Sequence, residues 1–359
     1  MEVVTLAPES DRWTEVLAEV RHDAYHLPAF AAFAARRQEP GDPRLYLVQD
    51  DAARMLVPLI VRGIPPSIAG DGPPSYDATS SRGYPGPIVA VPGQGSESAF
   101  AERALEALGE HLRQEGVVCA FIRMHPLFPV PEDAFGRHGS LVDHGDSVFV
   151  DLGLSEEELM AQTRHGHRQD INRATRLGYV ARIDERWERF DAFVDLFAES
   201  MDRVGATAYW RLTRDYFVDL RDSLAGRIHL CVVEIDGVVA SAGLLTEVDG
   251  IVEYHLAGTA NEHVRASPSK LVVDFARRWA KDRGNRLLHL TGSLRRGDSL
   301  SNFKTGFSPL TRPVCSWRFI SDEPEYRRLV ERWTIRHGTV ADAADGFFPA
   351  YRKPPPDAG

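Results

Sequence analysis

Two halves of the chain share one order of apolar runs and amphipathic segments. In both halves, a pair of β-rich runs flanks a short polar turn, at Asp50-Asp51 in the first and at Asp236-Gly237 in the second. An Asp-Gly pair between apolar runs is a strong hairpin signal. This shared pattern predicts two similar domains, residues 1–150 and 151–345, followed by a tail of residues 346–359. The expected helices are 11–20, 28–37, 97–115, 186–204, 213–224 and 268–283.

The best-defined helix begins at Pro268, and its apolar stripe from Leu271 to Trp279 predicts a face packed in a core. A strand precedes it, another follows, and the next segment ends in Phe303-Lys304. This order resembles a GNAT acyltransferase with a single lysine beside the sheet. Residues 265–270 read RASPSK and lack the glycines that let a backbone approach phosphates. The pattern therefore predicts a GNAT-type sheet without the usual acetyl-CoA loop.

Composition and charge narrow the function classes. The chain has 359 residues, 43% of them hydrophobic, which suffices for one large core or two ordinary ones. A net charge of −10 argues against a general nucleic-acid binder but allows a local basic patch. No apolar run reaches membrane-spanning length, and the acidic N-terminus does not resemble a signal peptide. The cysteines Cys119, Cys231 and Cys315 lie far apart in apolar runs, so we expect reduced thiols in a cytoplasmic protein.

The densest basic stretch of this acidic chain follows Ser155. Ser155 and Glu158 form a capping-box pattern, which predicts the start of a helix. The helix leads into TRHGHRQDINRATRLG, which ends at Gly178. Such an excess of one charge sign is typical of a solvated helix face or of a contact with a polyanion, and both remain open. His165 and His167 are two residues apart and point in different directions on a helix, so we expect no metal site.

The sequence carries no signature of covalent catalysis. It has no Gly-x-Ser-x-Gly elbow, no P-loop and no cysteine placed as a nucleophile. These absences favour direct attack by a bound amine on a bound acyl donor, which needs positioning and stabilisation of an oxyanion. The amine must lose a proton, and Asp77 and Glu253 are the candidate carboxylates. The irregular loop 64–92 offers Asp77 and Tyr84 as substrate contacts, unless it is simply a proline-stiffened surface loop.

Several segments, spread over about residues 25–319, resemble the Fem-type aminoacyltransferases. Members of that family transfer an amino acid from aminoacyl-tRNA to an amine of a peptide acceptor, in cell-wall precursors or peptide natural products. The resemblance implies an α/β (α+β) fold with two tandem GNAT-like domains, each a mixed, mostly antiparallel sheet flanked by helices. The segments are GYPGP at 83–87, HRQDINRATRLGY at 167–179, FAESMDRVGATAYWRLTRDYF at 197–217, YHLAGT at 254–259, ASPSKLV at 266–272 and SNFKTGFSP at 301–309.

The same resemblance implies roles for individual residues. Lys304 would lie near the reacting ester carbonyl and stabilise the oxyanion or the terminal ribose, with Phe303 packed at the same place. Arg36 stands where the family often has a basic residue that contacts the phosphates of the precursor. The remaining implied contacts are Arg203, Arg211 and Tyr254 in the acceptor cleft, and Arg164, His167, Arg168 and Arg173 for the tRNA.

The chain departs from the family in two places. After GYPGP the family often has an acidic residue, whereas this chain continues with Ile88, which argues against the usual cell-wall precursor. The long helical-hairpin arm of the family has no counterpart between residues 154 and 204. We therefore expect contact mainly with the acceptor end of the tRNA.

Together these observations predict a monomeric aminoacyltransferase that needs no metal or cofactor. Its co-substrate would be aminoacyl-tRNA, and its acceptor a small peptide or peptidyl-nucleotide. An acyl-CoA-dependent N-acyltransferase with a degenerate loop is the first alternative. A binding protein that kept the fold and lost the chemistry is the second, because a fold does not determine a function.

Overall fold

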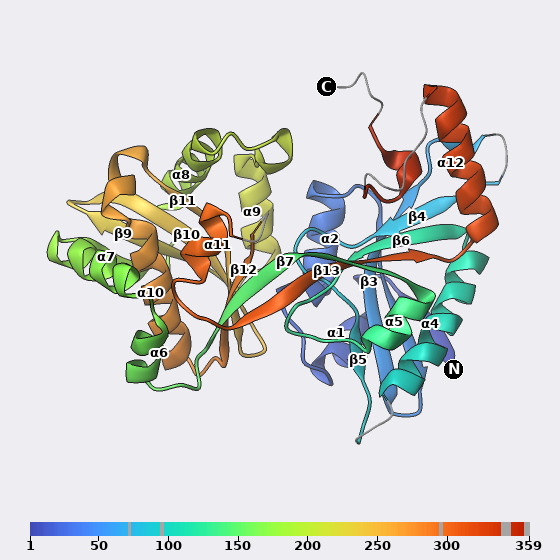
Figure 1. The fold of residues 1–359 in the computed structure, drawn as a ribbon, viewed down its shortest axis with the longest axis horizontal. Coiled ribbons are helices and arrows are strands. Elements are labelled where there is room, and N and C mark those ends of the chain that lie inside the picture. Colours follow the sequence, from blue (N-terminus) through green and yellow to red (C-terminus); the bar gives the residue numbers. More distant parts are fainter. Residues whose placement is uncertain (71–72, 94–96, 294–296, 339–345, 355–359) are drawn as a thin grey trace. The chain divides into compact units, whose positions relative to one another are not determined.

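The computed structural model describes residues 1–70, 73–93, 97–293, 297–338 and 346–354, which form two compact units. Unit 1 comprises residues 1–21, 25–144 and 314–359, and unit 2 comprises residues 22–24 and 145–313. Each unit is built on a mixed sheet flanked by helices (Figure 1). No helix within the described ranges is long and apolar enough to cross a membrane.

The sheet of unit 1 is antiparallel except at one pair of its described strands. Its strands are β1 (Glu2–Leu6), β2 (Asp42–Asp50), β3 (Ala53–Gly63), β4 (Tyr76–Thr79), β5 (Ile88–Ala90), β6 (Val117–Arg123) and β13 (Thr311–Ile320). They follow the order β1-β2-β3-β4-β6-β13, with β5 on β3, and β4 and β6 form the parallel pair. The β2–β3 hairpin turns at Asp50-Asp51, as predicted. Asp51 adopts a φ of 51°, a value that Asp tolerates in a tight turn.

Helices cover two apolar clusters of unit 1. The first cluster joins buried side chains of α4 and α5 to the sheet, where Leu105 and Leu108 meet Tyr46 and Trp317. The second joins α12 to β6 through Trp333. Figure 1 shows α4 and α5 lying side by side. The helices of this unit are α1 (Asp11–Ala18), α2 (Pro28–Arg37), α3 (Pro66–Ala69), α4 (Glu97–Gln114), α5 (Glu132–His138) and α12 (Glu323–His337), with a 3-10 turn at Ala350–Arg352.

The last strand divides the chain differently from the sequence pattern. β13 pairs antiparallel with β6, from Ser316 opposite Arg123 to Ile320 opposite Cys119. Residues 314–359 therefore belong to unit 1, whereas the pattern places everything up to residue 345 in the second domain. The expected tail also contributes Tyr351 to a buried cluster. A strand that returns to a distant sheet leaves no local signal, because period-2 alternation does not say which neighbour a strand will pair with.

The sheet of unit 2 runs in the order β7-β12-β11-β10-β9-β8. Its strands are β7 (Gly139–Asp151), β8 (Val180–Ile183), β9 (Ile228–Ile235), β10 (Val238–Val248), β11 (Ile251–Thr259) and β12 (Leu287–Gly292). The β9–β10 hairpin turns at Asp236-Gly237, where both residues have positive φ, as the Asp-Gly signal predicts. Among these described strands, β11 and β12 form the parallel pair.

The helices of unit 2 lie on both faces of its sheet. α10 packs its predicted stripe, including Leu271 and Val272, into the main core of the unit. The basic region is two helices rather than one, because the chain breaks at Thr163 and Arg164 between them. The helices are α6 (Glu156–Gln162), α7 (His165–Arg176), α8 (Phe190–Arg203), α9 (Arg214–Ser223), α10 (Pro268–Asp282) and α11 (Ser299–Lys304), with 3-10 turns at Ala208–Trp210 and Asn261–Ala266.

The two parallel strands of unit 2 separate midway along their length. β11 and β12 pair only from Ile251 opposite Leu287 to Glu253 opposite His289. Beyond this point β11 continues beside β10 to Thr259, and β12 continues beside β7 to Gly292. Ligands of open α/β sheets bind beyond the carboxyl ends of parallel strands. The side chains at and just after Glu253 and His289 are therefore candidates for a ligand-binding site.

Candidate active site

Lys304 is a buried lysine at the end of α11, with 4% of its surface exposed. Its Nζ donates to Thr291 Oγ1 at 2.7 Å and to the carbonyl oxygen of Gly292 at 2.5 Å. Burial lowers the pKa of Lys304 to about 7, although the charges of Glu253 and Asp298 oppose this shift. A lysine with this pKa exchanges its proton near neutral pH, which suits a group that meets developing charge.

The backbone of β12 is distorted at the residue that binds Lys304. The register of β12 against β7 shifts between His289 and Thr291. Thr291 has a φ of 64°, which is rare for a β-branched residue. A bulge of this kind re-aims side chains and is frequent beside active sites. Here it accompanies the contact of Thr291 Oγ1 with the buried amine.

Contacts from α7 hold α11 in place. His167 Nε2 donates to the carbonyl oxygen of Phe303 at 2.9 Å, and burial lowers the pKa of His167. The Arg164 guanidinium donates to the carbonyl oxygen of Asn302 at 3.3 Å. A Cβ at Gly306 would lie 2.1 Å from His167 Nε2, so only glycine allows this close approach. The segment that carries Lys304 is therefore positioned by α7.

Next to Lys304, a line of buried polar side chains crosses three strands. Ser147 Oγ on β7 lies 2.5 Å from His289 Nε2 on β12. His289 Nδ1 lies 3.0 Å from Glu253 Oε2 on β11, and His255 Nδ1 lies 3.1 Å from Glu253 Oε1. Ser147 pairs in register with Gly292, whose carbonyl oxygen accepts from Lys304. The line and the lysine therefore belong to one site within unit 2.

Glu253 is fully buried, and its two carboxylate oxygens are each bonded to a histidine. Burial by itself would raise the pKa of Glu253, but the hydrogen bonds from His255 and His289 hold it well below its usual range. A carboxylate stabilised in this way is a weak base. The structure thus keeps the predicted residue at the site but changes its role, because the proton-accepting capacity of this line resides in the imidazole rings.

The other predicted carboxylate, Asp77, lies in unit 1 and is also fully buried. Its Oδ1 accepts from Arg62 Nε at 2.9 Å, and its Oδ2 accepts from the Tyr351 hydroxyl at 3.2 Å and from Arg352. Both oxygens are occupied by groups of the same unit. Asp77 therefore does not fit the predicted role of a general base or a substrate contact. Its contacts tie the C-terminal turn to β3 and β4.

Tyr254 faces away from the site, contrary to its predicted place in a cleft. It belongs to the core that α10 covers, and a Cβ at Gly243 would meet its ring at 2.8 Å. Side chains alternate along a strand, so Tyr254 points to the opposite face from Glu253 and His255. Burial raises the pKa of the Tyr254 hydroxyl.

The five other predicted substrate contacts are spread over the two units. Arg203, at the end of α8, donates to the Thr259 carbonyl oxygen and to Asn261. Arg211 forms an exposed ion pair with Asp202. In unit 1, Arg36 lies exposed in the last turn of α2, and the Tyr84 ring packs near Tyr25 and His125. Phe303 precedes Lys304 in α11 and packs against Phe307.

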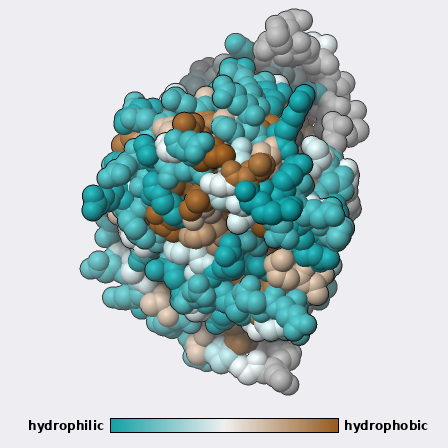
Figure 2. Space-filling view, turned by 90° about the vertical axis from the view of Figure 1, so that its left-hand side faces the viewer, coloured by the Kyte–Doolittle hydropathy of each residue, from teal (hydrophilic) through white to brown (hydrophobic). Residues whose placement is uncertain are grey.

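The predicted tRNA contacts separate into buried and exposed side chains. His167 is buried, and Arg168 donates to the carbonyl oxygens of Met160 and Thr163, which end α6. These two side chains serve the packing of unit 2. Arg164 and Arg173 are partly exposed, and the face of the unit that carries α7 is largely hydrophilic with smaller apolar areas (Figure 2). Arg164 and Arg173 therefore remain predicted contacts for a polyanion.

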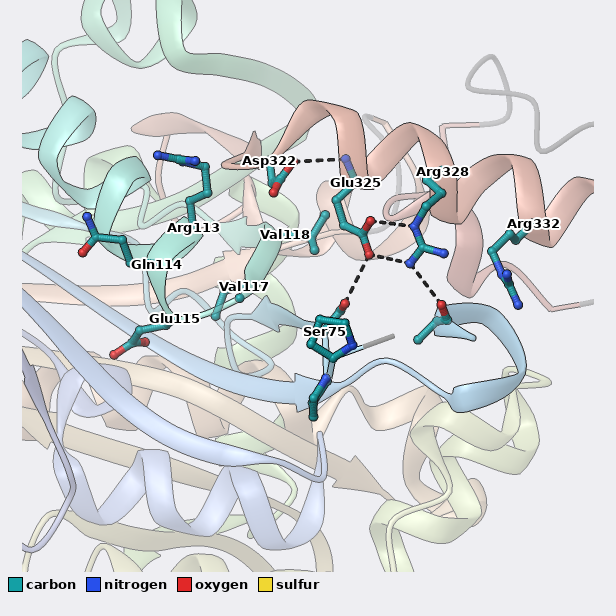
Figure 3. A pocket seen from close by; sticks show the side chains of 14 residues that line it. Ser75, Arg113, Gln114, Glu115, Val117, Val118, Asp322, Glu325, Arg328 and Arg332 are labelled. Atoms are coloured by element: carbon teal, nitrogen blue, oxygen red, sulfur yellow. Dashed lines mark hydrogen bonds and ion pairs between the residues drawn. The ribbon is translucent and has the colours of Figure 1, made fainter. Parts of the chain in front are cut away.

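Unit 1 contains a polar cavity of about 680 Å³ beside the first turns of α12. Figure 3 shows Glu325 between Arg328 and Ser75, and the cavity also receives Arg113 and Arg332. Glu325 accepts from Arg328 Nε at 2.6 Å and from the Ser75 hydroxyl at 3.2 Å, so its charge is neutralised by Arg328. None of the described residues that line this cavity is His, Cys or Lys.

Sequence reasoning missed Ser147, His289 and Thr291. A polar residue at alternate positions of a buried strand is the available signal, since LLHLTG places His289 between apolar residues. The contact between Ser147 and His289 joins residues 142 positions apart, which local patterns do not reveal. No group of three or more His, Cys, Asp or Glu residues in the described ranges is arranged to hold a metal ion.

Comparisons with known proteins agree with this architecture. Residues 161–305 match the family model of the acetyltransferase (GNAT) domain. The fold resembles that of FemX, with a TM-score of 0.70 and 14% identity over 91% of this chain and 99% of that one. It also resembles the C-terminal domain (DUF2156) of a putative lysylphosphatidylglycerol synthetase from Agrobacterium fabrum, with a TM-score of 0.53 and 14% identity over 89% of this chain and 93% of that one. No curated protein matches the chain.

These matches confirm the predicted fold class. The chain has a mixed α/β fold of the GNAT type, and residues 161–305 carry the acetyltransferase (GNAT) domain match. At 14% identity the structural matches establish the fold alone. The substrate has to be inferred from the residues of the site.

Proposed function

We propose that this chain is an aminoacyltransferase that moves an amino acid from aminoacyl-tRNA to a free amine of a peptide acceptor, forming a peptide bond. The acceptor would be a peptidyl natural product or a peptidoglycan precursor. One observation carries the proposal: a buried lysine with a pKa of about 7 lies where the parallel strands of the GNAT-like unit separate. The similarity of the whole chain to FemX supports it.

Lys304 would stabilise the charge that develops during transfer. The acceptor amine attacks the ester carbonyl, and the carbonyl oxygen becomes an oxyanion. The Nζ of Lys304 already donates to Thr291 and Gly292, so its remaining N–H is held in a fixed direction. A preorganised donor in a water-poor site stabilises an oxyanion far more than it would in water. Collapse of the intermediate then releases the ribose hydroxyl of the tRNA.

The segment before α10 argues for a donor other than acyl-CoA. A GNAT enzyme binds the CoA pyrophosphate on backbone amides at the start of this helix. Here Pro268 occupies the first position of α10, and Ser267 before it adopts a left-handed conformation. The 3-10 turn Asn261–Ala266 forms the connection, and Arg173 donates to the carbonyl oxygen of Arg265 within it. The glycine-lined approach of phosphates to the backbone is missing.

The match of residues 161–305 to the acetyltransferase (GNAT) domain keeps acyl-CoA as the rival donor. The two possibilities share the fold and the lysine and differ in the donor alone. A donor assay therefore separates them.

The test is transfer of radiolabelled amino acid from a pool of aminoacyl-tRNAs to small peptide amines, with and without RNase, beside a parallel assay with acyl-CoA. Lys304→Met is the test variant. Lys281→Met is the matched control, because Lys281 also donates to two carbonyl oxygens, those of Leu152 and Leu154, but stands outside the site. We expect RNase-sensitive transfer that falls about 100-fold or more in Lys304→Met and persists in Lys281→Met.

Two outcomes would contradict the proposal. Transfer that survives RNase and requires acyl-CoA would assign the chain to the rival class. Binding of aminoacyl-tRNA and acceptor without any transfer would identify a binding protein that has lost the chemistry.

A further inference from the structure

The order of hydrogen bonds through Ser147, His289 and Glu253 defines a direction for proton movement. Glu253 is ionised and accepts only, so His289 donates to it from Nδ1. With Nδ1 protonated, Nε2 of the neutral ring carries the lone pair and accepts from the Ser147 hydroxyl. In this arrangement of hydroxyl, imidazole and carboxylate, the ring can take the proton of the hydroxyl group and the carboxylate stabilises the imidazolium that forms.

Ser147 is the member of this line whose backbone pairs with a residue that binds Lys304. Its backbone pairs with Gly292, which accepts from Lys304 Nζ, and the charge of Glu253 acts on Lys304. Ser147 and the Lys304 amine therefore flank one residue, Gly292. The attacking amine bonds to the same carbon that bears the oxyanion, which brings its N–H groups within reach of Ser147 Oγ.

We propose that Ser147, with His289 behind it, is the proton acceptor for the attacking amine. This inference rests on the proposed function. As the C–N bond forms, an amine proton passes to Ser147 Oγ and the Ser147 proton passes to His289 Nε2. The imidazolium is stabilised by Glu253. When the ester C–O bond breaks, the proton returns through Ser147 to the ribose oxygen, so the relay ends in its starting state.

A relay fits Ser147 better than direct attack by its oxygen. Nucleophilic serines are commonly presented on a sharp turn with backbone N–H groups nearby. Ser147 instead lies within the paired stretch of β7, and 1% of its surface is exposed. Proton transfer needs only one hydrogen bond to reach Oγ, whereas an acyl-serine needs space for a tetrahedral carbon.

The titratable groups around His289 come from two elements besides its own strand. β11 supplies Glu253 and His255, and α11 supplies Lys304, whose pKa responds to Glu253. An effect on the rate that comes from His289 must therefore be distinguished from one that comes from Lys304. The variants below keep the lysine in place for this reason.

The experiment is single-turnover transfer over pH 5.5–9 with wild type, Ser147→Ala, Ser147→Thr and His289→Gln. Ser241→Ala is the control, because Ser241 is an equally buried serine of unit 2 that bonds to Gly258 and Thr259. We expect kcat to fall about 100-fold in Ser147→Ala and His289→Gln with KM unchanged. Ser147→Thr keeps a hydroxyl and should retain most of the rate, as should Ser241→Ala.

Three results would overturn the relay. Equal rates for Ser147→Ala and Ser241→Ala would show a packing role. An acyl adduct on Ser147 in the intact mass would show a nucleophile instead. A ¹⁵N NMR spectrum of the imidazoles with the His289 proton on Nε2 would reverse the direction of the line. The NMR result does not depend on transfer, so it tests the relay even if wild type transfers nothing and the proposed function fails.

Discussion

Asp77 in unit 1 and Glu253 in unit 2 are both fully buried carboxylates, yet their partners differ in kind. Asp77 accepts from Arg62 and Arg352, which keep their charge at every pH that the fold tolerates. Glu253 is bonded to His255 and His289, whose second ring nitrogens can donate or accept according to the tautomer. A carboxylate among arginines fixes structure, whereas a carboxylate among histidines sets which ring nitrogen carries the proton.

The comparison also explains why the sequence predicted the same role, that of a proton acceptor, for both residues. In the sequence each is an acidic residue next to an apolar strand, and nothing local identifies its partners. Arg352 follows Asp77 by 275 positions and His289 follows Glu253 by 36. The chemistry of the two sites is thus set by residues brought from elsewhere.

The largest expected effect is on stability and concerns Asp77. Asp77→Asn removes the charge between Arg62 and Arg352 and should lower the free energy of unfolding by about 3 kcal/mol, because buried cations lose their partner. Denaturant unfolding measures this loss. Transfer per folded molecule should stay unchanged, and a 100-fold fall in kcat of the folded fraction would break the contrast between the two carboxylates.

Glu253→Gln should produce the opposite balance. The amide keeps the size of the side chain but no longer stabilises an imidazolium at His289, so kcat should fall about 10- to 100-fold. The free energy of unfolding should fall by only about 1 kcal/mol, since some hydrogen bonds to the site are kept. Single-turnover rates and denaturant unfolding on one preparation provide both numbers. A stability loss as large as that of Asp77→Asn, with the rate intact, would make Glu253 structural as well.

Lys304 extends the comparison to a buried cation, because burial of its charge costs folding free energy. Its pKa in the folded protein is about 7, below that of an unfolded lysine, so the unfolded chain binds more protons between these values. Wild-type stability should therefore rise with pH above about 7, whereas Lys304→Met should lack this rise. At pH 6 the variant should be more stable than wild type by about 2 kcal/mol although it is inactive.

The same pKa predicts a pH profile for catalysis. If the charged lysine stabilises the oxyanion, kcat should decline as the pH rises through about 7. A rate that increases through this range in wild type and equally in His289→Gln would assign Lys304 to proton acceptance and remove the need for His289.

Gly306 gives the smallest effect and tests whether the site depends on the position of α11. Gly306→Ala places a methyl group against the His167 ring and should cost about 1–3 kcal/mol while lowering kcat about 10-fold. Gly166→Ala on α7 is the matched control, because a Cβ there meets nothing within 4 Å. It should stabilise the helix by about 0.5–1 kcal/mol and leave kcat unchanged. Equal kcat in the two variants would separate the lysine from its support by α7.

Local signals predicted the elements of the fold well. The two hairpins, the helix from Pro268 and the cap at Ser155 are determined by neighbouring residues, and each is found. The return of β13 to unit 1 and the register between β7 and β12 depend on long-range pairing, which no short window contains. Lys304 was selected from the sequence because the segment SNFKTGFSP resembles a family motif.

The sequence did not reveal on which face of its strand Tyr254 lies. A one-residue error in assigning a face exchanges every inward side chain for an outward one. The motif drew attention to Tyr254, whereas its neighbours Glu253 and His255 reach the polar line. Knowledge of which face α10 covers would have corrected the prediction, but that knowledge is tertiary.

The return of β13 to the sheet of unit 1 has a consequence for the order of events on the ribosome. The main segment of unit 2, Gly145–Pro313, is synthesised after most of unit 1 but before its last strand. At ordinary elongation rates the edge of β6 waits on the order of 10–40 s for β13. During that interval Val118 and Cys119 also lack the cover that Trp333 and Tyr351 later provide. The domain begun first is thus the last to close, and a nascent chain stalled near residue 313 exposes a hydrophobic strand to chaperones.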